Sequence, residues 1–237
     1  MPTVRVFAPA STAHENIPIY QALAHAFAAE GVEQPADAAE FSIEPGVLDP
    51  RRVIDALDRV LPKDYDSVSG SGHQSYFHSI MRGRKPENYH AMREFGAIGN
   101  GLSFAIGVAA AKRHGKVVLF DGDGSVLMHI QELEMVKRHR LKLLICVLND
   151  GAYGSEIHKL RSDGLDDSGA VFGRTDLAAI AKGFGLRGAT ITDVNQFPKL
   201  FEAYAAQDTA ELWNIHVSDT VVSPSTRRGT VRGHGKM

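Results

Sequence analysis

The sequence has a single cysteine, no long apolar run and no excess of charge of either sign. Cys146 lies within an apolar segment, so it excludes a disulfide framework and suits a reducing compartment. No run of about eighteen apolar residues and no basic-then-apolar N-terminal pattern is present, which argues against a membrane span or a signal peptide. The net charge of −2 gives no sign of a nucleic-acid partner. These absences predict a cytoplasmic protein that binds neither nucleic acid nor membrane.

Two short apolar runs do stand out, and each ends abruptly in glycine and aspartate. They occupy residues 116–125 and 141–154, and residues 126–139 between them carry apolar side chains at helical spacing. This pattern predicts a strand–helix–strand unit with parallel strands. Asp123 and Asp150 then lie just past the carboxyl ends of two strands, where open α/β sheets bind their ligands.

The two carboxylates predict a divalent cation between them, because they would otherwise repel each other. Carboxylate oxygens suit Mg²⁺ or Ca²⁺ better than zinc. Gly122 and Gly124 allow close approach of the backbone to a ligand, and Ser125 stands at the start of the following helix, which favours phosphate. The residue types therefore indicate a metal ion together with a diphosphate.

These motifs resemble the thiamine-diphosphate motif of the acetolactate synthase and pyruvate decarboxylase family, which reads Gly-Asp-Gly and then Asn-Asn. Here residues 122–125 read Gly-Asp-Gly-Ser and residues 149–150 read Asn-Asp, at the family's spacing. The resemblance extends over residues 45–218. It implies that Asp123, Asp150 and the backbone carbonyl of Ala152 bind Mg²⁺. The family usually has Asn where this chain has Asp150. Whether the extra negative charge strengthens binding of the metal or weakens binding of the cofactor stays open.

The resemblance also implies cofactor contacts elsewhere in the chain. The turn at residues 72–74 contacts the diphosphate in related enzymes, although a plain strand-to-helix turn fits this sequence equally well. The carbonyl of Gly96 would accept a hydrogen bond from the 4′-amino group, and Ile98 would support the bent V shape of the two rings. The cofactor-binding residues implied in this way are Gly72, His73, Gln74, Gly96, Ile98, Gly122, Gly124, Ser125, Tyr153 and Gly154.

The rest of the chain alternates between helical and strand patterns, which predicts a doubly wound α/β fold with a mostly parallel sheet and helices on both faces. The predicted helices cover residues 49–61, 95–111, 175–185 and 195–206, and the predicted strands cover residues 65–69, 186–191 and 211–217. Residues 151–173 are predicted as a long polar loop in which Lys159 and Arg161 are candidates to meet a substrate carboxylate.

The sequence patterns and the family resemblance together predict three segments. Residues 1–45 form a helix over 17–31 and a linker, which resembles the opening of the family's pyrimidine-binding domain but also suits an ordinary surface helix. Residues 46–218 form the thiamine-diphosphate and Mg²⁺ domain, and residues 219–237 form a flexible tail.

The resemblance implies a lyase or transferase of the acetolactate synthase type that uses thiamine diphosphate and Mg²⁺ on a 2-oxo acid. No catalytic residue is assigned, because the family's activating glutamate lies on a pyrimidine-binding domain for which residues 1–45 leave no room. We consider three interpretations. The chain is one half of an active site completed by another chain in a homo- or hetero-oligomer, a truncated binding module, or a non-thiamine protein that binds Mg²⁺ and a nucleotide. A calcium loop starting at Asp121 fits poorly, because Val126 occupies the position that requires glycine.

Overall fold

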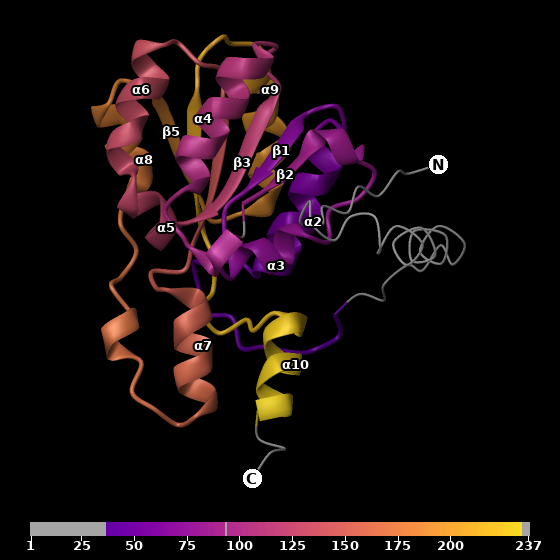
Figure 1. The fold of residues 1–237 in the computed structure, drawn as a ribbon, viewed down its shortest axis with the longest axis vertical. Helices are drawn as coiled ribbons and strands as arrows, with labels where there is room; N and C mark the ends of the chain where they lie inside the picture. The colour runs from indigo at the N-terminus through magenta and orange to yellow at the C-terminus, as the bar shows by residue number, and fades with distance from the viewer. Residues whose placement is uncertain (1–36, 93, 234–237) are drawn as a thin grey trace, which may run out of the picture.

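A single six-stranded sheet, with every strand parallel to its neighbours, forms the centre of the molecule (Figure 1). The computed structural model describes residues 37–92 and 94–233. The strand order is β2-β1-β3-β4-β6-β5. The strands are β1 Asp66–Ser69, β2 Tyr89–Ala91, β3 Val117–Gly122, β4 Leu144–Asn149, β5 Arg187–Ile191 and β6 Glu211–His216. The helix predicted for residues 17–31 lies outside the described residues.

Helices cover both faces of this sheet, as the doubly wound prediction requires. One face carries α2 Pro50–Val60, α3 Gln74–His78 and α9 Phe197–Ala205. The other carries α4 Gly101–Lys112, α5 Asp123–Met128, α6 Leu133–Arg138 and α8 Leu177–Gly183. Two further helices, α7 Gly154–Ser162 and α10 Pro224–Gly233, lie beyond the carboxyl ends of the strands (Figure 1). The fold class predicted from the sequence is confirmed.

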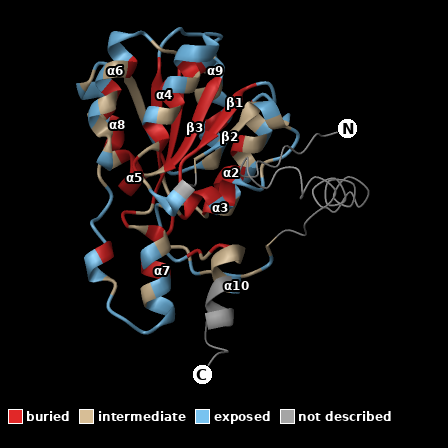
Figure 2. Ribbon diagram, viewed as in Figure 1, coloured by how far each residue is buried: buried red, intermediate tan, exposed pale blue. Residues whose placement is uncertain are grey.

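The apolar runs form strands because both of their faces are buried. All six residues of β4 are buried, and so are the first five of β3. Alternate side chains enter two separate cores, so that Phe120 packs with the α2 and α9 side while Leu119 packs with the α4 and α6 side. Figure 2 shows the resulting distribution, with buried residues on the strands and on the sheet-facing sides of the helices.

Capping residues position two of the helices that the periodicity predicts. The side chain of Asp49 accepts a hydrogen bond from the Arg51 backbone amide, and Pro50 occupies the first turn of α2. Asp176 accepts from the Ala179 amide and begins α8 in the same way. These two helices, together with β1, β3, β4, β5 and β6, lie where the sequence predicts them.

Several elements differ from the prediction. The predicted helix over residues 126–139 is divided into α5 and α6, because His129, with φ −130° and ψ 28°, departs from helical geometry. Helix α7 occupies the first part of the predicted polar loop. Strand β2 and helix α3 are short and follow the predicted strand at residues 65–69. Helix α10 forms within residues 219–237, where the sequence predicts a flexible tail.

The register of the central strands brings their carboxyl ends to one level. Gly122 of β3 pairs with Leu148 of β4, so the loops that follow leave the sheet side by side. The chain passes from β1 outward to β2 and then returns to β3 on the other side of β1, which makes the β1–β3 boundary the switch point of the sheet. None of the helices within residues 37–92 and 94–233 combines the length and the apolarity needed to cross a bilayer.

Candidate functional site

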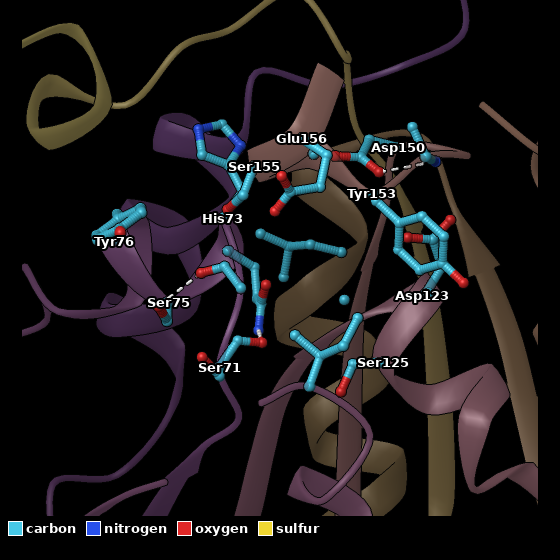
Figure 3. A pocket seen from close by; sticks show the side chains of 18 of the residues that line it. Ser71, His73, Ser75, Tyr76, Asp123, Ser125, Asp150, Tyr153, Ser155 and Glu156 are labelled. Atoms are coloured by element: carbon cyan, nitrogen blue, oxygen red, sulfur yellow. Dashed lines mark hydrogen bonds between the residues drawn. The ribbon is translucent and has the colours of Figure 1, made fainter. Parts of the chain in front are cut away.

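A cavity of about 690 Å³ opens at the carboxyl ends of β1, β3 and β4, at the switch point of the sheet (Figure 3). Every residue for which the sequence suggests a cofactor or metal contact contributes to its lining. These residues are Gly72, His73, Gln74, Gly96, Ile98, Gly122, Asp123, Gly124, Ser125, Asp150, Ala152, Tyr153 and Gly154. They come from four separate stretches of the chain. The fold therefore brings the predicted residues to one place, while the role of each one stays a prediction.

Asp123 and Asp150 lie next to each other on one side of the cavity, with Tyr153, while His73 and Tyr76 lie on the other side (Figure 3). An Asp123 carboxylate oxygen accepts from the Gly151 amide at 2.9 Å, and Asp150 accepts from the Ala152 amide at 3.1 Å. Burial raises the pKa of Asp123 to about 6. Burial, and then the charge of Asp123, raises the pKa of Asp150 well above its usual range.

This pair of carboxyls has the features of a cation site. Neither Asp123 nor Asp150 forms an ion pair with a lysine or arginine of the described residues. No backbone amide in that part of the chain donates to the carbonyl oxygen of Ala152 outside regular helices and strands. The described residues contain no cluster of three or more His, Cys, Asp or Glu side chains suited to a metal. A hard cation would thus need the two carboxylates, the Ala152 carbonyl and ligand oxygens, and this donor set fits Mg²⁺.

Asp121 of β3 is a fully buried carboxyl behind the cavity, and its hydrogen bonds link this strand to α3 and α5. It accepts hydrogen bonds from the hydroxyl of Ser125 at 2.9 Å, the amide of Gly122 at 3.0 Å and the side-chain amide of Gln74 at 3.2 Å. The Ser125 hydroxyl in turn accepts from the amide of Gly99 at 2.8 Å. Burial raises the pKa of Asp121 to about 7. Sequence reasoning considered this residue only as the start of a calcium loop.

Glycines around the cavity and behind it bring backbone segments unusually close to side chains. A Cβ on Gly124 would lie 2.7 Å from the ring of Tyr153. A Cβ on Gly154 would lie 2.6 Å from an Asp150 carboxylate oxygen. Behind the cavity, a Cβ on Gly101 would lie 2.3 Å from an Asp121 oxygen. Close packing thus disfavours a side chain at these three positions, against Tyr153 at Gly124 and against aspartates at Gly154 and Gly101.

Helix α7 places charged side chains at the mouth of the cavity. Glu156 and Lys159 both line it, and they form an ion pair with each other. In Figure 3, Glu156 points between the His73 side and the Asp150 side. Arg161 instead binds Asp167 and Asp219 and is absent from the lining. Of the two predicted candidates for a substrate carboxylate, only Lys159 therefore reaches the cavity.

Further lining residues had little or no sequence signal. The polar and apolar side chains that complete the wall are Pro50, Ser71, Ser75, Tyr76, Phe77, Met128, Leu148, Ser155, Val217 and Ser218. Most of them lie close in sequence to a predicted site residue. That closeness was the only sequence feature that could have indicated them. Val217 and Ser218 follow the last strand and reach the cavity through tertiary structure alone.

The family model for "Thiamine pyrophosphate enzyme, C-terminal TPP binding domain" matches residues 70–215. The chain belongs to this family of thiamine pyrophosphate enzymes. The matched residues run from the loop after β1 almost to the end of β6, and they include both aspartates of the cavity. Membership of the family confirms the resemblance drawn from the motifs.

Several acetolactate synthases are related in sequence to this thiamine pyrophosphate domain. The large subunit of acetolactate synthase isozyme 2 of Escherichia coli is 28% identical over 149 residues, which cover 62% of this chain and 27% of that protein. Chloroplastic acetolactate synthase 2 of Zea mays is 30% identical over 158 residues, which cover 61% of this chain and 24% of that protein. The chain thus spans about a quarter of the length of these relatives.

Solved structures agree with this assignment. The thiamine diphosphate-dependent 4-hydroxybenzoylformate decarboxylase of Rhodococcus jostii RHA1 superposes with a TM-score of 0.67 at 25% identity, covering 79% of this chain and 36% of that one. Benzoylformate decarboxylase of Polynucleobacter necessarius superposes with a TM-score of 0.69 at 16% identity, covering 79% of this chain and 36% of that one, which supports the fold alone.

Proposed function

We propose that the chain binds thiamine diphosphate through Mg²⁺ and supplies the diphosphate half of a 2-oxo-acid decarboxylase or acetolactate synthase active site. The observation that carries the proposal is the pair of buried carboxyls, Asp123 and Asp150, at one wall of the cavity. Two adjacent buried carboxylates are strongly disfavoured unless a cation neutralises them. In a thiamine pyrophosphate enzyme that cation would also hold the diphosphate.

Each group would have a defined task at this site. Asp123, Asp150 and the carbonyl of Ala152 would hold Mg²⁺, and the turn at residues 72–74 would contact the diphosphate. Gly96 and Ile98 line the same cavity and would contact the two rings. Thiamine diphosphate supplies a carbanion nucleophile and an electron sink for decarboxylation. The protein's share is to bind it, to orient it and to exclude water.

Activation of the cofactor needs a group that we do not assign within this chain. We propose that a pyrimidine-binding domain from another chain provides it, in a homo- or hetero-oligomer of the cytoplasm. Apolar side chains near the cavity support such a contact, because Tyr76 and Met128 line it and are still 38% and 45% exposed. Lys159, also at the cavity mouth, is the candidate to meet the carboxylate of the 2-oxo acid.

Titration of the purified chain with thiamine diphosphate, with and without Mg²⁺, tests this proposal. Asp123→Ala should weaken Mg²⁺-dependent binding by at least about 100-fold, because losing even an outer-shell partner costs about 10- to 100-fold. Glu134→Ala is the control, since Glu134 is exposed on α6 and, among the described residues, forms an ion pair with Arg138 alone. Unchanged binding by Asp123→Ala would remove the metal assignment.

Two further measurements separate the alternatives. Recovery of a second polypeptide that restores decarboxylation would support the two-chain active site, whereas turnover of pyruvate by this chain alone would contradict it. If cofactor binds but no partner restores activity, the chain is a binding module only. Tighter binding of ATP than of thiamine diphosphate in calorimetry would instead favour a nucleotide site.

A further inference from the structure

The two ring nitrogens of His73 have different surroundings. His73 is buried to 93%, since its exposed fraction is 7%. Its ring packs against Phe77 and His158, with centroid distances of 4.9 and 4.5 Å. Its Nε2 accepts a hydrogen bond from the backbone N–H of Ser223 at 3.1 Å. Its Nδ1 makes no hydrogen bond with any of the described residues.

A backbone N–H can only donate, and this fixes the protonation of the ring. An Nε2 that accepts from Ser223 cannot itself carry a proton, so a neutral His73 must carry its proton on Nδ1. Burial, and then the neighbouring His158, lowers the pKa of His73 to about 3, so the ring stays neutral near pH 7. The alternative tautomer would place two N–H donors against each other.

The Nδ1 side of the ring lies next to the cavity. A Cβ built on Gly154 would be 3.3 Å from Nδ1 of His73, and both residues line the cavity. This nitrogen is therefore the one polar position of the ring left for a ligand. A neutral N–H donor at this place suits an anionic oxygen acceptor.

The chain that supplies the Ser223 amide is held firmly by the rest of the protein. Ser223 is fully buried, and its hydroxyl bonds to that of Thr226 at 2.8 Å in the first turn of α10. Val221 is buried in the core formed by α2 and α9. Arg161 of α7 donates to both the carbonyl and the carboxylate of Asp219 at 2.8 Å. The amide is thus fixed on both sides along the chain.

We propose that Ser223 is a positioning residue of the cofactor site. Its backbone N–H holds His73 in the Nδ1–H tautomer and so presents a neutral donor to an anionic oxygen of the ligand. Residues 219–223, which follow the last strand, thereby belong to the site even though none of them lines the cavity. The effect on thiamine diphosphate rests on the proposed function, whereas the tautomer does not.

Nuclear magnetic resonance of the unmodified, ligand-free chain labelled with ¹⁵N tests the tautomer directly. His73 should show a protonated Nδ1 and an unprotonated Nε2 near pH 7, with a coupling across the hydrogen bond from the Ser223 amide nitrogen to Nε2. His73→Gln assigns the signals among the eleven histidines. A proton on Nε2, or on both nitrogens, would overturn the proposal.

Two variants test the consequence for binding. Ser223→Pro removes the N–H and should give a mixture of tautomers and about tenfold weaker binding of thiamine diphosphate, which is the loss of one hydrogen bond to a charged group. Ser223→Ala keeps the N–H and loses only the hydroxyl cap of α10, so it should retain the tautomer and the affinity.

Each outcome has one meaning. Equal effects of Ser223→Pro and Ser223→Ala would show that residue 223 acts only through the structure of α10 and would refute the positioning role. If Ser223→Pro does not fold, the coupling from the Ser223 amide nitrogen to Nε2 of His73 in the unmodified chain tests the proposal on its own. If the unmodified chain has the Nδ1–H tautomer but binds no thiamine diphosphate, the proposed function fails while the assignment of the tautomer stands.

Discussion

Asp150 is the residue whose chemistry departs from the family's motif, which usually has Asn at this position. Its carboxyl lies beside Asp123 in a buried place, and both pKa values are raised. A raised pKa means that the folded state binds a proton more tightly than the unfolded chain does. Ionisation of these groups therefore lowers the stability of the metal-free chain as the pH rises above about 4.

Asp150→Asn should therefore stabilise the metal-free chain by about 2 kcal/mol at pH 8, the order expected when a poorly compensated buried charge is removed. The gain should disappear as the pH falls below about 4, because the carboxyl then becomes protonated in both states. The same variant should bind Mg²⁺ more weakly. Its Mg²⁺ affinity should also increase less steeply between pH 5 and 8, because one proton fewer is released when the ion binds. Urea unfolding and Mg²⁺ titration across this pH range measure both effects. A loss of stability at pH 8 would contradict the claim that the buried charges of Asp123 and Asp150 destabilise the metal-free chain.

At the scale of elements, the start of α4 is fixed against the strands by a glycine. The Cβ of an alanine at Gly101 would lie 2.3 Å from an Asp121 oxygen and 3.1 Å from the backbone of Gly70. Helix α4 follows the loop that carries Gly96 and Ile98, so its position also sets one wall of the cavity.

Gly101→Ala should cost about 2 to 3 kcal/mol of stability, because the buried Asp121 cannot move without breaking its hydrogen bonds. Gly107→Ala on the same helix is the matched control, since no atom lies within 4 Å of its added Cβ. That change should stabilise the protein by about 0.5 to 1 kcal/mol. Denaturant unfolding of the two variants compares them, and destabilisation of equal size would contradict the close-packing argument.

The opposite end of the sheet is held by a second buried carboxyl, Asp66 at the start of β1. His90 of β2 and His114 before β3 both contact it at 2.8 Å, and Lys112 of α4 lies at 3.4 Å. Burial alone would raise the pKa of Asp66, but the hydrogen bond from His90 and the charge of Lys112 outweigh it and lower the pKa. A lowered pKa stabilises the fold above the unfolded-state pKa of about 4 and loses that contribution as the pH falls further.

Asp66→Asn should therefore destabilise the chain at pH 7 by about 2 kcal/mol, and the difference from the unmodified chain should shrink below pH 4. Asp64→Asn is the control, because Asp64 is exposed and pairs with an exposed lysine, Lys116, so little change is expected. Thermal unfolding from pH 3 to pH 7 distinguishes the two. A difference that stays constant down to pH 3 would exclude the ionised carboxylate as the cause.

At the scale of the whole molecule, several large apolar side chains remain exposed on and around the cavity side of the fold. Ile80 is 50% exposed and Met128 is 45% exposed, while Phe95 projects fully from the glycine-rich turn. A surface of this kind is typical of a protein contact.

Ile80→Lys together with Phe95→Ser should weaken association of the chain with itself or with a partner by about tenfold or more, since two apolar anchors are lost. Leu165→Ser is the control, because Leu165 is 59% exposed but lies beyond the C-terminal end of α7, whose first turns line the cavity. Sedimentation over a range of concentrations measures the effect. Equal weakening by the control would indicate a general loss of apolar surface instead of a defined interface.

Much of this architecture could be predicted from local sequence. The apolar runs of β3 and β4 end at Asp123 and Asp150, and a parallel sheet necessarily brings such ends together. Helix α7 was missed because only Gly154, Ile157 and His158 of its nine residues are buried, so its periodicity is weak.

Contacts between distant parts of the chain could not be predicted in this way. Nothing in the residues around His73 points to the amide of Ser223, because 150 positions separate the two. Asp121 gave no signal of its role as a junction, since its partner Gln74 belongs to α3 and Gly99 joins the network only by donating to Ser125. The motifs therefore predict which residues gather at the site, while the network that holds them depends on tertiary structure.

The position of β6 in the sheet also determines when this fold can be completed during synthesis. β6 lies between β4 and β5, and both of these strands precede it in the chain. Until residue 216 has left the ribosome, β4 and β5 have no strand to join them, and each presents an unpaired edge. A nascent chain halted before β6 should therefore be prone to aggregation and should bind chaperones.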